Sequence, residues 1–154
     1  MAAAHETIAK RSGHVAVNGV NYYYELHGKG EPLLLLHGGL GSIDMFAPIM
    51  PILAGHRLVI AVDLQGHGRT PLGDRPIRLI DMGDDMAVIL KTLGYDTADV
   101  LGYSMGAGVA LRLAVQHPKP FAEWPWSPAA SRRTASIRKC CRCRRRWARR
   151  WPTR

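Results

Sequence analysis

Ser104 lies at the centre of a G-x-S-x-G motif that runs from Gly102 to Gly106, between a short apolar run and a stretch rich in small residues. Where a strand turns abruptly into a helix, the residue at the turn is held in a strained conformation with its side chain exposed, and glycines two positions away avoid collisions. The motif therefore predicts that Ser104 is a nucleophile. The amide of Met105 would lie at the helix start, where the dipole favours developing negative charge. A chance G-x-S-x-G in a Gly-rich loop is the alternative.

A glycine-rich loop, H-G-G-L-G-S, begins at His37 after an apolar run. Such a loop can turn a backbone N–H toward a substrate oxygen, and we expect the amide of Gly39 or Leu40 to form an oxyanion hole with that of Met105. Each donor of this kind is worth about 3 kcal/mol. The alternative is a phosphate-binding loop, which the missing G-x-G-x-x-G spacing and the missing Lys argue against. We expect His37 and Gly38 to have structural roles.

A third motif, D-L-Q-G-H-G-R-T, begins at Asp63 after another apolar run. It should lie at the carboxyl edge of the sheet, where open α/β folds bind ligands. Asp63 is expected to accept hydrogen bonds from loop amides, and His67 to shape the floor of the site. A direct catalytic role for either residue is the less favoured alternative.

The elements that must position these residues follow from the apolar pattern. Uninterrupted apolar runs are typical of strands covered on both faces in a parallel sheet, whereas apolar spacings of three and four indicate a helix. An Asn-Gly pair favours a two-residue hairpin turn, because such a turn needs positive φ angles. Strands that alternate with helices imply right-handed crossovers. We expect a hairpin (15–17 and 20–26), buried strands at 33–36, 58–62 and around 100–101, and helices over 79–93 and from 104 to 117.

The three motifs together resemble the α/β-hydrolase superfamily, in the family's order, over residues 14–118. L-L-L-L-H-G-G corresponds to the oxyanion strand and loop, D-L-Q-G-H-G-R to the next strand end, and G-Y-S-M-G to the nucleophile elbow. The resemblance implies a serine hydrolase that acts on a small ester, lactone or carbon–carbon bond substrate through an acyl-enzyme on Ser104, with no metal or organic cofactor. Haloalkane dehalogenases and epoxide hydrolases of this fold carry Asp at the position of Ser104. The small-substrate bacterial type is most similar.

The catalytic base and acid of this family are not evident in the sequence. A serine hydroxyl needs a histidine base oriented by a carboxylate, and the family order is Ser, acid, His. After Ser104 the only acid is Glu123 and the only histidine is His117, in the wrong order. His117 would lie about 20 Å along the helix that follows Ser104. We therefore expect an incomplete α/β-hydrolase fold, and a chain that alone has little or no activity.

The composition changes sharply near residue 120. Residues 1–120 carry ten Lys and Arg against eleven acids, whereas residues 121–154 carry eleven Lys and Arg against one acid, with all four Trp and all three Cys. We expect a hydrolase part at 1–118 and a disordered tail at 119–154. The tail has three interpretations: a nucleic-acid or anionic-surface arm of a non-enzymatic binder, a zinc site with too few cysteines, or a frameshift product. We favour the frameshift, which would account for both the composition and the missing residues.

The predicted location follows from what the sequence lacks. Its longest apolar runs are far shorter than the roughly 18 residues of a membrane span, and no secretory signal is visible. The first 120 residues contain no Cys, so no disulfide framework is expected there. We predict a cytoplasmic protein, and the family resemblance implies a small-molecule substrate. The strand around Val100 would be left with a bare edge, which favours self-association.

Overall fold

The computed structural model describes residues 11–118. The chain begins with a hairpin of β1 (Arg11–Val17) and β2 (Val20–His27), in which Val17 pairs with Val20. Asn18 and Gly19 form the turn with φ angles of 47° and 83°. Positive φ at both central residues is the geometry that an Asn-Gly pair favours, so the predicted hairpin is confirmed.

The remaining strands complete a five-stranded mixed sheet with the order β1-β2-β4-β3-β5. β2 runs antiparallel to β4, whereas β3 runs parallel to both of its neighbours. The added strands are β3 (Pro32–Leu36), β4 (Leu58–Val62) and β5 (Asp99–Gly102). The predicted α/β fold class, a hairpin followed by parallel strands with crossover helices, is therefore confirmed.

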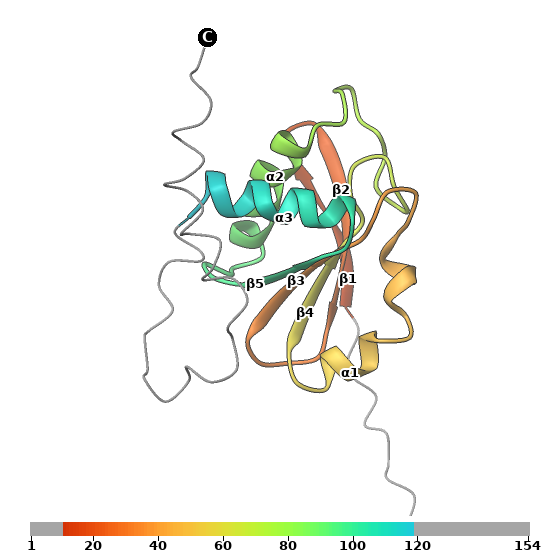
Figure 1. The fold of residues 1–154 in the computed structure, drawn as a ribbon, viewed down its shortest axis with the longest axis vertical. Helices are drawn as coiled ribbons and strands as arrows, with labels where there is room; N and C mark the ends of the chain where they lie inside the picture. The colour runs from red at the N-terminus through yellow and green to blue at the C-terminus, as the bar shows by residue number, and fades with distance from the viewer. Residues whose placement is uncertain (1–10, 119–154) are drawn as a thin grey trace, which may run out of the picture. The chain divides into compact units, whose positions relative to one another are not determined.

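Helices cover both faces of the sheet, with α2 and α3 on one face and the short α1 on the other (Figure 1). Alternate residues of β3 divide between two cores: Leu34 and Leu36 pack toward α2 and α3, whereas Leu33 and Leu35 pack toward η1 and α1. This alternation explains why both buried strands read as unbroken apolar runs. The helices are η1 (Ile43–Phe46), α1 (Met50–Ala54), α2 (Leu79–Thr92) and α3 (Met105–Gln116).

The two long helices match their predicted ranges, and they pack closely. A Cβ at Gly83 of α2 would lie 2.8 Å from the Cβ of Arg112 in α3, so only glycine allows this approach. α2 is followed by Gly94, with a φ of 87°, and α3 stops before Pro118. Both signals are typical helix ends.

Among residues 11–118, β5 has a strand neighbour on one side only, and Leu101 in it is 43% exposed. The interpretations of the Arg-, Trp- and Cys-rich segment concern residues 119–154, which lie outside the described part of the chain.

Candidate active site

Ser104 occupies the turn between β5 and α3. Its backbone is in an unusual left-handed conformation, with φ 52° and ψ −111°, and its side chain is exposed. A Cβ at Gly102 would clash with the carbonyl oxygen of Gly106, and a Cβ at Gly106 would clash with that of Leu36. Both flanking glycines are therefore required by close backbone approach, as a strand–turn–helix elbow demands.

The loop that follows β3 packs directly against this turn. A Cβ at Gly38 would lie 3.3 Å from the Cβ of Ser104, and a Cβ at Gly39 would lie 3.9 Å from the sulfur of Met105. The amides of Gly39, Leu40 and Met105 make no hydrogen bond within residues 11–118. The structure thus brings three unbonded amides of the predicted oxyanion loop and elbow to the same region as Ser104.

Leu40 is the strained residue of this loop. The amide of Gly41 donates to the carbonyl of Gly38 at 3.2 Å, which closes a β-turn with Leu40 at its third position. The φ angle of Leu40 is 61°, as in a type II turn, where glycine is the usual residue. For a residue with a side chain this conformation costs about 1–2 kcal/mol. The Leu40 side chain is fully exposed and makes no packing contact that offsets the cost.

His37 holds the start of the same loop. Its buried ring accepts a hydrogen bond at Nε2 from the amide of Leu64, 2.9 Å away, and Nδ1 lies 2.7 Å from the carbonyl oxygen of Gly38. These partners assign a neutral ring with its proton on Nδ1. Burial lowers the pKa of His37, opposed by the Gly38 carbonyl and by Asp63. Both nitrogens bond to backbone, so His37 is not free to act as a base.

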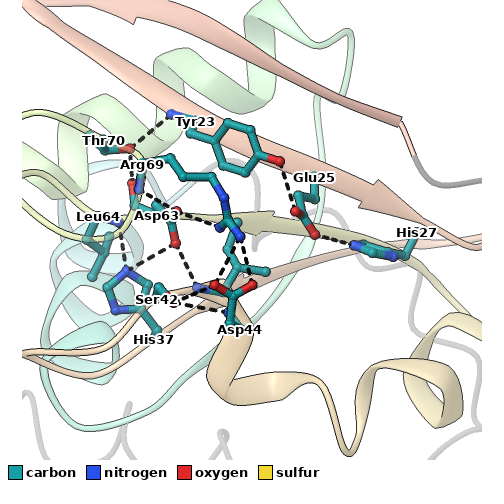
Figure 2. A network of polar contacts seen from close by, with 11 residues as sticks. Tyr23, Glu25, His27, His37, Ser42, Asp44, Asp63, Leu64, Arg69 and Thr70 are labelled. Atoms are coloured by element: carbon teal, nitrogen blue, oxygen red, sulfur yellow. Dashed lines mark hydrogen bonds and ion pairs between the residues drawn. The ribbon is translucent and has the colours of Figure 1, made fainter.

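Asp63 joins the loop after β3 to the loop after β4 (Figure 2). Its buried carboxylate accepts hydrogen bonds from the amide of Ile43 at 2.7 Å and from the amide of Arg69 at 2.9 Å. A Cβ at Gly68, where φ is 54°, would clash with this carboxylate. Asp63 therefore accepts loop amides, the contacts that the sequence predicts for it.

Arg69 extends this connection to Asp44, a contact that the sequence does not reveal. Its Nη1 donates to Asp63 at 3.1 Å, and its Nη2 lies 2.8 and 3.0 Å from the two carboxylate oxygens of Asp44. The guanidinium also lies over the ring of Tyr23, 4.8 Å from its centroid. The hydrogen bond to Asp44 is the main cause that raises the pKa of Arg69. Arg69 bridges the carboxylates of Asp63, which follows β4, and Asp44, which lies in η1.

No histidine in residues 11–118 is hydrogen-bonded to Ser104. The ring of His67 lies 5.4 Å from that of His37, and its Nδ1 is 2.8 Å from the carbonyl oxygen of Gln65. His117, at the far end of α3, contacts Asp84 at 2.7 Å. Within residues 11–118 the hydroxyl of Ser104 has no hydrogen-bond partner, so the described part holds the candidate nucleophile and oxyanion amides without an acid–base pair.

Metal-binding clusters and membrane-spanning helices are both absent from residues 11–118. It holds no group of three or more His, Cys, Asp or Glu side chains arranged to bind a metal ion. None of the helices between residues 11 and 118 has the length and apolar character to cross a membrane.

Comparison with known proteins places these features in a family. The family model described as the alpha/beta hydrolase fold matches residues 31–123, more than half of the chain. The chain belongs to the α/β-hydrolase family. This match ends within the region where the composition changes.

Three similar proteins show the range of this family. An Azorhizobium caulinodans protein, provisionally named the carbamate hydrolase RutD, is 32% identical over 80% of this chain and 47% of its own length. Est816, an N-acyl homoserine lactone degrading enzyme, shares 30% identity with a TM-score of 0.66, over 70% of this chain and 41% of its own. A haloalkane dehalogenase variant from Bradyrhizobium elkanii shares 30% identity with a TM-score of 0.63, over 71% of this chain and 37% of its own. The chain spans less than half of each of these α/β hydrolases.

Proposed function

We propose that this α/β hydrolase uses Ser104 as the nucleophile of a serine hydrolase reaction. The acyl group of the substrate is transferred from its leaving group, which departs with the hydroxyl proton, to the Ser104 oxygen, and water then hydrolyses the acyl-enzyme. The observation that carries the proposal is the left-handed backbone of Ser104 beside the unbonded amides of Met105 and the loop after β3. Met105 is the first residue of α3, so its amide adds the favourable helix dipole. Gly39 or Leu40 supplies the second donor to the tetrahedral intermediate.

The proposed substrate is a small ester, a lactone or a compound with a cleavable carbon–carbon bond, and the reaction needs no metal or organic cofactor. Ser at position 104 supports acyl transfer over the dehalogenase and epoxide hydrolase chemistries, which use Asp there. In this proposal Gly102 and Gly106 permit the elbow, and Gly38 the close approach of the loop, while His37, Asp63 and His67 support the site structurally.

For this chain alone we propose little or no turnover. No histidine among residues 11–118 is hydrogen-bonded to Ser104, and residues 119–154 contain no histidine. Without a base the serine hydroxyl is a weak nucleophile, and loss of one triad member removes most of the rate. The remaining catalysis would come from the oxyanion hole.

Two measurements test these proposals. A fluorophosphonate probe should label the chain slowly at Ser104, and Ser104→Ala should abolish the labelling. Hydrolysis of p-nitrophenyl acetate should be barely above the background rate. If labelling persisted in Ser104→Ala, the assignment of Ser104 as the nucleophile would be refuted. A fast turnover that depends on Ser104 would refute the proposal that this chain lacks a catalytic base.

A second candidate function rests on the charge of residues 121–154, where eleven Lys and Arg accompany a single acid. A segment of this charge would bind nucleic acid or an anionic surface with a steep salt dependence. Retention on heparin that is lost on deletion of 121–154 would favour this non-enzymatic function.

The frameshift interpretation also remains a proposal, and the end of the family match at residue 123 supports it. Sequencing of the DNA around codons 116–124 tests it. An open frame with no hydrolase-like continuation in either alternative frame would rule it out.

A further inference from the structure

We propose that Asp44 and Arg69 are positioning residues, which hold the turn from Gly38 to Gly41 in the strained conformation that directs the Leu40 amide. The inference rests on the proposed function of this loop as an oxyanion hole. It assigns a role to an ion pair that joins η1 to the loop after β4, between residues 25 positions apart in the chain.

The need for such a pair follows from Leu40. A leucine with a φ of 61° and a fully exposed side chain has no packing contact of its own that favours the left-handed state. Strained conformations persist only where the surrounding structure determines them. If φ of Leu40 returned to a negative value, the peptide between Gly39 and Leu40 would rotate, and the Leu40 N–H would point elsewhere.

The loop is fixed at both of its ends. At its start, the carbonyl of Gly38 is bonded to the buried ring of His37. At its end, the amide of Ile43 donates to Asp63, and Arg69 links that same carboxylate to Asp44 (Figure 2). With both ends held, the residues between them have little room to relax.

Of the two ends of this loop, the end near Asp44 is the one that a single surface substitution can loosen. The side chains of Arg69 and Asp44 are 39% and 67% exposed, whereas Asp63 is fully buried. An exposed ion pair contributes little to global stability. Loss of the pair should therefore loosen the loop and leave the fold intact, which separates a positioning role from a purely structural one.

Amide exchange of the ¹⁵N-labelled chain tests the proposal, with the Gly41 amide as probe because it is hydrogen-bonded only when the turn is formed. In Asp44→Asn, which leaves the contact of Arg69 with buried Asp63 in place, we expect exchange at Gly41 to be about tenfold faster, with unchanged exchange in β3 and β4 and an unchanged Tm. Asp44→Glu, which keeps the carboxylate, should restore slow exchange. An unchanged rate at Gly41, or a general loss of protection, would overturn the proposal.

Leu40→Gly supplies the decisive control, because glycine adopts positive φ at no steric cost. In that background Asp44→Asn should change exchange at Gly41 by less than about threefold. An equal effect in both backgrounds would show that the ion pair does not act through the strain of Leu40. The result does not depend on catalysis, since the same pattern is expected in Ser104→Ala; a failure of fluorophosphonate labelling would count against the proposed nucleophile alone.

Discussion

The carbonyl oxygen of Leu36, at the end of β3, accepts a hydrogen bond from the amide of Tyr103, which is 2.9 Å away and one residue before Ser104. Gly106, in the first turn of α3, packs against the same oxygen so closely that no side chain fits there. One carbonyl of β3 therefore fixes the chain on both sides of Ser104.

Gly106→Ala should destabilise the fold, because the added Cβ meets the backbone of Leu36 and lies 2.6 Å from the carbonyl oxygen of His37. Overpacking against backbone costs about 1–3 kcal/mol, and urea unfolding should show a loss of this size. Gly39→Ala is the matched control: its Cβ meets only the Met105 sulfur, at 3.9 Å. Equal stabilities for Gly106→Ala and wild type would contradict the tight packing of the elbow.

Ser104→Gly should stabilise the chain while it abolishes labelling at this position. The φ of 52° is strained for serine but not for glycine, so the free energy of unfolding should rise by about 1 kcal/mol. Ser104→Ala keeps the Cβ and should give no such gain. If both variants were equally stable, the elbow would store no strain.

Most of the fold could be predicted because its signals are local. The Asn18-Gly19 turn, the apolar runs of β3 and β4 and the spacing in α2 each act within a short segment, and all four are found where the pattern places them. η1 and α1 were not predicted. They are only four and five residues long, and α1 contains Pro51, so neither shows a helical period.

The residues of the candidate site could be predicted from the sequence. The strained backbone of its loop and the contacts between distant residues could not. The loop after β3 is rich in glycine, yet the positive φ falls on Leu40, and neither Gly39 nor Gly41 adopts one. A local propensity cannot reveal this, because tertiary contacts fix the loop. The pairing of Asp44 with Arg69 has no signal either, since nothing in the sequence links two charges that are 25 residues apart.

The free energy of unfolding should decrease as the pH is lowered through the titration range of His37. Because burial lowers its pKa in the folded chain below the usual 6.5, the unfolded chain binds the proton more readily. The stabilising contribution of neutral His37 is then complete above about pH 6.5 and is lost as the pH falls below it. Urea unfolding between pH 5 and 7.5 should show this slope in wild type and a flatter one in His37→Gln. Parallel curves would contradict the neutral, backbone-bonded ring.

Asp85→Asn should be far more damaging than the same change at its neighbour Asp84. Asp85 is fully buried and accepts hydrogen bonds from Tyr22 at 2.6 Å and Asn18 at 2.8 Å, beside an ion pair with Arg75. Loss of one partner of a buried pair costs about 3–5 kcal/mol. Asp84 is half exposed, so Asp84→Asn should cost less than about 1 kcal/mol. Thermal unfolding of the two variants tests this difference in stability. Similar losses of stability in both variants would contradict the buried, paired state of Asp85.

The edge of β5 should make the chain associate with itself. Within residues 11–118 β5 bonds to β3 alone, and unpaired strand edges with exposed apolar side chains promote pairing between chains. Leu101→Lys places a charge on this edge and should shift the chain toward monomer in size-exclusion chromatography with light scattering. Leu111→Lys is the matched control, because Leu111 is 60% exposed but lies on α3. A monomeric wild type, or equal shifts in both variants, would show that the β5 edge does not drive association.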